Sequence, residues 1–158
     1  MNDISMFDII GPNMIGPSSS HTAGALRIAH LAGKLAPGRI LSVTFTLYGS
    51  FAWTYRGHGT DRALVGGILG FLPDDERIRD SFQYAKAAGL KYEFIENTIE
   101  KDIHPNTVDI LLHCENDHTI KLRGESIGGG NAVIRQLNGI DIALSGAYST
   151  LIVHHRDK

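Results

Sequence analysis

The chain has 158 residues, of which 42% are hydrophobic and 20% charged, a balance typical of a single globular domain. Lys and Arg total 15 against 17 Asp and Glu, giving a net charge of -2 that does not suggest a basic nucleic-acid-binding surface. No apolar run approaches the roughly 18 residues needed to span a bilayer, and the N-terminus lacks signal-peptide features. We therefore expect a cytoplasmic protein, without membrane or nucleic-acid partners.

Cysteine and histidine usage limits the metal chemistry available to the chain. Cys114 is the only cysteine, so neither an intrachain disulfide nor a cysteine-ligated zinc or iron-sulfur site can be completed from this sequence alone. Eight histidines are present, but no His-x-x-x-His or HExxH spacing occurs. The sequence therefore predicts no metal ligands of its own.

The first half of the chain predicts a loop, two helices and a strand. Residues 1–20 contain two Gly-Pro pairs and predict an ordered loop, and the Ala- and Leu-rich stretch 22–36 predicts a helix capped by Ser20 or Thr22. Alternating β-branched and aromatic residues predict a strand over 40–48.

A second helix should follow the glycine-flanked His58, with Thr60 or Asp61 as its cap. Three glycines lie inside this segment, at positions 66, 67 and 70. Because each interior glycine weakens a helix by up to about 1 kcal/mol, they predict a close approach by another backbone.

The second half predicts mainly strands. An amphipathic helix over 75–88 should stop at Gly89, and strands are expected within 91–97, 107–115 and 118–127, with a hairpin turn at 115–118. The apolar segments 128–142 and 148–155 are too short to assign. This order predicts an α+β fold: a mainly antiparallel or mixed sheet with helices packed on one face.

Four polar, mostly glycine-containing segments are candidates for chemistry: "GPSSSHTAG" (16–24), "YRGHGTD" (55–61), "IHPNT" (103–107) and "ESIGGGN" (125–131). In the first, the hydroxyls of Ser18, Ser19, Ser20 and Thr22 precede a helix, whose free N–H groups attract a carboxylate or phosphate. The alternative is that one serine simply caps the helix.

Histidines in the first two segments suggest proton transfer. The ordinary pKa of His21, about 6.5, suits a general base near neutrality, and His58 repeats the layout between two glycines. The alternative is an inert loop histidine, and the sequence alone does not bring the two together in space.

The last two segments carry weaker signals. "HPN" is compatible with a simple turn, and "GGGN" is neither a dinucleotide fingerprint nor a Walker A motif, which favours a β-bulge or an unhindered approach to a ligand. Four arginines could each bind a carboxylate or simply be solvated: Arg56, Arg62, Arg123 and Arg135.

Taken together, "GPSSSHTAG", "GHGTD", "HPN" and "SIGGGN" resemble the β chain of the iron-sulfur-dependent bacterial L-serine dehydratases, over almost the whole chain. The resemblance implies elimination of water from L-serine, giving pyruvate and ammonia in serine catabolism and gluconeogenesis. It also implies a partner α chain that holds a [4Fe-4S] cluster. The cluster's open iron would act as a Lewis acid on the substrate hydroxyl.

By this resemblance, His21 and His58 are the catalytic candidates, and the residues expected to bind L-serine are Ser18, Ser19, Ser20, Thr22 and Asn131. The sequence does not say which histidine is the base. The isolated chain is expected to be inactive.

The resemblance also covers domain organisation. The family's β chain is similar to the allosteric substrate-binding domain of some phosphoglycerate dehydrogenases, and it usually continues into an ACT domain. We therefore predict a β-chain domain over residues 1–150 and the start of a truncated ACT domain over 151–158. Two other functions stay open: a non-catalytic regulatory module that binds serine or a small anion, and a scaffold that forms a homodimer.

Overall fold

A computed structural model describes residues 13–153 of the chain. It contains one sheet in the order β2-β1-β3-β4-β5-β6, in which β1 and β2 are parallel and all other neighbours are antiparallel. The strands are β1 (Ile40–Tyr48), β2 (Lys91–Asn97), β3 (Thr107–Cys114), β4 (Thr119–Gly128), β5 (Asn131–Leu137) and β6 (Ile140–Leu144). The predicted α+β class with a mixed, mostly antiparallel sheet is confirmed.

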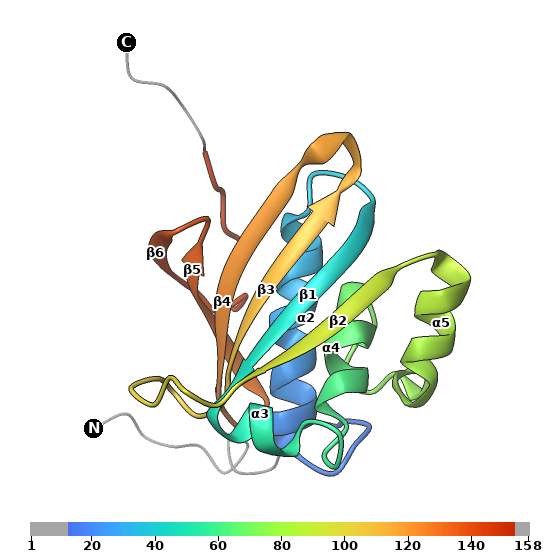
Figure 1. The fold of residues 1–158 in the computed structure, drawn as a ribbon, viewed down its shortest axis with the longest axis vertical. Coiled ribbons are helices and arrows are strands. Elements are labelled where there is room, and N and C mark those ends of the chain that lie inside the picture. Colours follow the sequence, from blue (N-terminus) through green and yellow to red (C-terminus); the bar gives the residue numbers. More distant parts are fainter. Residues whose placement is uncertain (1–12, 154–158) are drawn as a thin grey trace.

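The main helices lie on one side of the sheet, with α3 at one end of it (Figure 1). The helical elements are η1 (Ser19–Gly24), α2 (Ala25–Leu35), α3 (Gly49–Thr54), α4 (Thr60–Ile68), η2 (Glu76–Asp80), α5 (Ser81–Ala88) and η3 (Glu115–Asp117). The core between helices and sheet is continuous and includes the fully buried side chains of Leu26, Phe45, Phe51, Leu64 and Ile110. None of the helices within residues 13–153 is long and apolar enough to cross a membrane.

The first helix begins differently from the sequence prediction. Ser18, rather than Ser20 or Thr22, is the cap: its Oγ accepts a hydrogen bond from the His21 N–H at 3.1 Å. A π-helical turn, η1, follows and carries both predicted caps, and α2 begins only at Ala25. Residues 13–18 form no helix or strand, as predicted for this loop, whereas residues 1–12 lie outside the described part.

Helix α4 has neither of its predicted caps. Gly59 occupies the cap position with a φ of 70°, and the Tyr55 carbonyl accepts hydrogen bonds from the Thr60 and Asp61 N–H groups. Because a backbone carbonyl satisfies the first N–H groups, no side-chain cap is needed. The left-handed conformation at position 59 explains the glycine there.

The glycines of the α4 segment have different explanations. A Cβ at Gly67 would collide with the Leu26 carbonyl and the Ala29 side chain of α2, which confirms the expected close approach of another backbone. Gly70 instead follows the helix and has a φ of 87°. Helices α2 and α4 therefore pack backbone to backbone at one point.

Two further helical predictions needed correction. The helix predicted over 75–88 is split: η2 ends at Asp80 and α5 begins at Ser81, whose buried hydroxyl donates to the Ile78 carbonyl at 2.8 Å. Gly89 ends α5 as predicted, with a φ of 70°. Helix α3 was not predicted at all, because six residues are too few to show a helical period.

The hairpins of the sheet follow from their turn residues. Asn116 and Asp117, both with positive φ, connect β3 to β4 as predicted, and Gly129 and Gly130 connect β4 to β5. A register shift between Ser126 and Gly128 confirms the expected bulge beside the glycine run. Residues 128–142, whose type was open, contain β5 and most of the final hairpin. Residues 148–153 form no helix or strand.

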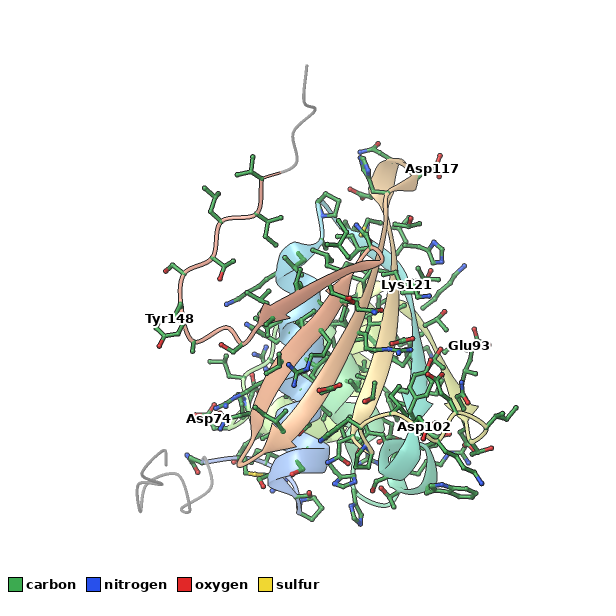
Figure 2. All side chains as sticks on the ribbon, turned by 90° about the vertical axis from the view of Figure 1, so that its left-hand side faces the viewer. Asp74, Glu93, Asp102, Asp117, Lys121 and Tyr148 are labelled. Atoms are coloured by element: carbon green, nitrogen blue, oxygen red, sulfur yellow. The ribbon has the colours of Figure 1, made fainter. Side chains whose placement is uncertain are left out.

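The two ends of the sheet carry different elements. Figure 2 shows Asp117 at the tip of the β3–β4 hairpin, Asp102 near α3 at the opposite end, and Tyr148 on the segment that leads away from β6. The candidate site lies at the α3 end, where η1 and the turn before α4 also lie.

Candidate functional site

The imidazoles of His21 and His58 lie against each other. Their ring centroids are 4.9 Å apart, with an angle of 76° between the planes. Phe51 of α3 contacts His21 from another side, with centroids 5.4 Å apart. Two loops separated by 36 residues thus supply one pair of titratable groups, a proximity that the sequence left open.

Hydrogen bonds hold the two loops together. The Thr22 hydroxyl donates to the carbonyl oxygen of His58 at 3.0 Å, and the His58 N–H donates to the Thr54 carbonyl at 3.0 Å. Thr22 is itself 2% exposed, so this bond is largely protected from water. Thr22 therefore connects the chain of one histidine to the chain of the other.

Both ring nitrogens of His21 have a serine hydroxyl nearby. Its Nε2 lies 2.8 Å from the Ser50 Oγ, and its Nδ1 lies 3.3 Å from the Ser18 Oγ. A neutral imidazole has one donor and one acceptor nitrogen, and a hydroxyl can serve either. Ser50 is a site residue that the sequence analysis missed, because it lies in the unpredicted helix α3.

The surroundings favour an uncharged His21. Partial burial, followed by the positive charge that a protonated His58 would carry, lowers the pKa of His21 below its ordinary value of 6.5. His58, in contrast, is exposed. The pair therefore combines a half-buried imidazole that favours the neutral form with an exposed one.

A cavity of about 370 Å³ opens beside His58. Its walls include Gly57, Gly59 and Thr22, and the guanidinium-bearing residues Arg56, Arg62 and Arg79. Arg56 and Arg62 were among the candidate carboxylate ligands, whereas Arg79 was not considered. The cavity has the size of an ordinary small-molecule site.

The other predicted serine-binding residues lie in two places. Ser19 and Ser20 are half-buried in η1, next to His21 in the chain. Asn131 starts β5, and its Oδ1 accepts a hydrogen bond from Arg27 at 3.1 Å. Asn131 lines a different cavity, of about 640 Å³, with Arg27, His30 and Lys34.

The segments "IHPNT" and "ESIGGGN" support the site by packing. A Cβ at Gly49 would come within 2.7 Å of Pro105, whose carbonyl accepts a hydrogen bond from the Phe51 N–H. Gly24, at the end of η1, lies against the buried hydroxyl of Ser126. All four candidate segments therefore lie at one end of the fold, although only two supply the imidazoles.

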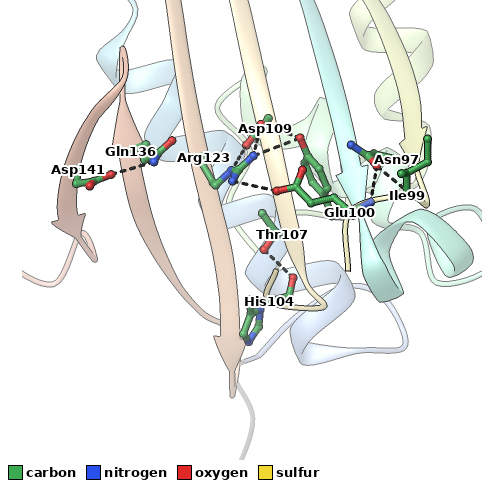
Figure 3. A network of polar contacts seen from close by, with 10 residues as sticks. Asn97, Ile99, Glu100, His104, Thr107, Asp109, Arg123, Gln136 and Asp141 are labelled. Atoms are coloured by element: carbon green, nitrogen blue, oxygen red, sulfur yellow. Dashed lines mark hydrogen bonds and ion pairs between the residues drawn. The ribbon is translucent and has the colours of Figure 1, made fainter. Parts of the chain in front are cut away.

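A polar network on the sheet fixes the approach to α3 (Figure 3). Arg123 binds both carboxylate oxygens of Asp109, at 2.6 and 2.8 Å, and the Tyr48 hydroxyl donates to Asp109 at 2.9 Å. Glu100 lies 3.8 Å from Arg123. Because Tyr48 is the last residue before α3, this network anchors the helix that carries Ser50.

The described residues do not form a place for an iron-sulfur cluster. Cys114 is 3% exposed on β3, and burial raises the pKa of its thiol, which disfavours the thiolate that binds metal. Among residues 13–153, no three His, Cys, Asp or Glu side chains are grouped to hold a metal ion. A cluster would need ligands from another chain.

Comparisons with known proteins agree on one family. The family model described as "Serine dehydratase beta chain" matches residues 5–137. The L-serine dehydratase beta chain of Peptoniphilus asaccharolyticus is 49% identical over all 158 residues, which cover 71% of that protein. A probable L-serine dehydratase beta chain of Bacillus subtilis is 48% identical over 155 residues, which are 98% of this chain and 69% of that one. The L-serine dehydratase of Haemophilus influenzae is 31% identical over 150 residues, spanning 80% of this chain and 33% of its own length.

Proposed function

This chain belongs to the serine dehydratase β-chain family and is part of an enzyme that deaminates L-serine, and we propose that its histidine pair transfers the substrate proton. The observation that carries the proposal is the 4.9 Å contact between the imidazoles of His21 and His58. Of the two, we assign the proton transfer to His58, because it is exposed and lines the cavity. His21 contacts the His58 imidazole and acts as the positioning residue.

The reaction assigned to this site is an elimination. His58 takes the proton from Cα of L-serine, and the electron pair of that C–H bond forms the Cα–Cβ double bond. The β-hydroxyl leaves as water after it gains a proton. The resulting aminoacrylate becomes an imine, which water hydrolyses to pyruvate and ammonia.

A neutral His21 supports this role. The serine hydroxyls beside its two nitrogens hold the His21 ring in one orientation, with its plane steeply inclined to that of His58. Its lowered pKa keeps it uncharged near neutral pH, so it does not repel a protonated His58. The half-buried Ser19 and Ser20 precede His21 in the chain.

We further propose that the partner is the α chain of L-serine dehydratase, as the name "beta chain" of the two longest-matching relatives suggests. The α chain would hold the [4Fe-4S] cluster, which supplies Lewis-acid chemistry when bound, because the described residues of this chain offer no ligands for it. A cytoplasmic location, the start of an ACT domain over 151–158 and a role in serine catabolism and gluconeogenesis remain part of the proposal. His154 and His155 lie outside the described residues.

Reconstitution tests the proposal. The purified chain is mixed anaerobically with the α chain, and pyruvate formation from L-serine is measured. We expect His58→Ala to reduce kcat by about 100-fold or more, in the range for loss of a general base. His113→Ala, an exposed histidine on β3, is the matched control. Full activity of the double variant His21→Ala/His58→Ala would exclude the catalytic role.

The alternative, a regulatory module that binds serine or a small anion, has its own observation. The cavity of about 640 Å³ is lined by Arg27, His30 and Lys34, all from α2, and includes Asn131. Calorimetric titration of the isolated chain with L-serine distinguishes the two functions. Micromolar binding that is lost in Arg27→Gln/Lys34→Gln would favour regulation, whereas absence of binding would favour a site completed by the α chain.

A homodimer also remains a proposal. Strands β2 and β6 are the edges of the sheet, and Ile140 on β6 is 68% exposed. An exposed edge with an apolar side chain can pair with a second copy. Light scattering on the purified chain gives its mass in solution.

A further inference from the structure

We propose that Arg56, Arg62 and Arg79 form the subsite that binds the carboxylate of the amino-acid substrate. This inference rests on the proposed function, because it places the substrate beside His58. The three arginines come from three separate elements: the turn after α3, helix α4 and the 3-10 helix η2. They nevertheless line one cavity, of about 370 Å³.

The lining of this cavity carries positive charge. Its lining contains three arginines and His58 but no Asp or Glu. Among residues 13–153, none of these guanidinium groups lies within 4.0 Å of a carboxylate, whereas Arg77, Arg123 and Arg135 all form such pairs. Three like charges around one concavity repel each other, and a bound anion would relieve that repulsion.

The acid next to Arg62 in the chain does not pair with its guanidinium. Asp61 precedes Arg62, but its Oδ1 accepts a hydrogen bond from the Arg62 backbone N–H, at 2.8 Å, and not from the guanidinium. Burial raises the pKa of Asp61, and the nearby Arg62 and Arg56 lower it only in part. Among residues 13–153, the guanidinium groups of Arg62 and Arg79 donate no hydrogen bond, whereas that of Arg56 lies over the Tyr55 ring, 5.2 Å from its centroid.

The chemistry of the donors selects a carboxylate. A guanidinium presents paired N–H donors in a plane that match the two oxygens of a carboxylate. Because His58 and Thr22 line the same cavity, a carboxylate held by the arginines would bring the Cα of a small amino acid toward the imidazole. Neutralising the carboxylate also makes the Cα proton easier to remove, since charge builds up next to it during the transfer.

This assignment changes the carboxylate partner expected from the sequence. The serines at the start of η1 and just before it were the expected ligands, but Ser18 already accepts from the His21 N–H and contacts its ring. Arg79 could not be found from the sequence, since helix α4 and the loop after it separate η2 from His58. If the arginines bind the carboxylate, replacing them should raise KM for L-serine more than replacing the serines does.

Kinetics of the assembled α/β enzyme tests the subsite. We expect Arg56→Gln, Arg62→Gln and Arg79→Gln each to raise KM for L-serine, and the triple variant to lower kcat/KM by about 10-fold or more, as loss of a charged hydrogen bond does. Arg39→Gln is the matched control. Arg39 lies just before the start of β1, whereas the site follows the end of that strand, and its guanidinium donates to the Ala88 carbonyl. Ser19→Ala/Ser20→Ala should leave KM nearer to that of the wild type than the arginine variants do.

A binding measurement separates this subsite from the catalytic proposal. Acetate, which carries the carboxylate alone, is titrated into the assembled enzyme by calorimetry, with acetamide as the uncharged probe and inorganic phosphate as the competing anion. Arginine-dependent binding of acetate, absent for acetamide, supports the subsite even if the histidine variants remain active. Unchanged KM in the triple variant, no arginine-dependent acetate binding, or binding of phosphate that L-serine does not displace would overturn it.

Discussion

The Nε2 of His21 lies 2.8 Å from the Oγ of Ser50, a side chain 29 residues away on helix α3. This contact holds one nitrogen of the His21 ring, while Ser18 lies beside the other nitrogen. The orientation of His21 thus depends on a six-residue helix whose own position is set by Tyr48 and Pro105.

Replacing Ser50 tests whether His21 must be oriented. In Ser50→Ala, the imidazole loses one hydrogen bond, worth about 1 kcal/mol, and we expect kcat to fall by about 5-fold with little change in KM. Ser50→Thr keeps the hydroxyl and should restore most of the activity. Ser42→Ala, on the strand β1 far from the site, is the control. Equal loss in Ser50→Thr and Ser50→Ala would argue against a role for the hydroxyl.

The pKa of His21 can be followed by NMR titration of its imidazole resonances. We expect it below 6.5, because burial and then the charge of His58 disfavour the protonated form. His58→Ala removes that charge and some of the burial, so the pKa of His21 should rise but stay below 6.5 while Phe51 still covers the ring. A pKa at or above 6.5 in the wild type would contradict the neutral imidazole.

Stability should depend on pH through the same group. Since the folded state lowers the pKa of His21, the unfolded chain binds a proton more readily below about pH 6.5. The full stability is therefore present above that pH and decreases as the pH falls below it. His30, whose pKa burial also lowers, acts in the same direction. The urea midpoint of His21→Gln should fall less steeply between about pH 7 and pH 5 than that of His113→Gln.

The contact between α2 and α4 predicts a large effect from a small substitution. A Cβ at Gly67 would overlap the Leu26 carbonyl, so Gly67→Ala should destabilise the fold by about 1–3 kcal/mol despite the better helix propensity of alanine. Gly38→Ala is the control, because nothing lies within 4 Å of a Cβ there. Urea unfolding of the two variants gives the comparison, and equal midpoints would contradict the close approach.

The polar network on the sheet can be tested by removing one acceptor. Asp109→Asn leaves Arg123 with a neutral partner and weakens the bond from Tyr48, so we expect a loss of about 1–3 kcal/mol in unfolding free energy. Glu93→Gln, on the exposed edge strand β2, serves as the control. If the loss is smaller than about 0.5 kcal/mol, the network does not anchor α3.

The sequence predicts well what depends on local chemistry. The strand β1, the hairpin turn at Asn116 and Asp117, and the helix end at Gly89 all follow from residue types that favour those conformations. The helix starts were wrong at both histidine loops, because backbone carbonyls and Ser18 satisfy the first N–H groups there. Several residues could have served as caps in each case.

The candidate site could be predicted only in part. His21 and His58 were found because glycines and hydroxyls surround them, but their contact depends on tertiary packing. Ser50 lies in a helix too short to show a pattern, and Arg79 has no local signal that separates it from a solvated arginine. Asn131 was grouped with the serines by motif alone, and the fold directs its side chain to Arg27.

The contact at Gly67 joins the two helices that follow the histidine loops. The loop of His21 leads into α2 and the loop of His58 leads into α4, so each imidazole is carried by the segment that begins one of these helices. Gly67 brings these two helices together through main-chain atoms, so the distance between them at that point is set by the backbone and not by side-chain volume. A larger residue at position 67 would push apart the helices that continue from the two histidine loops.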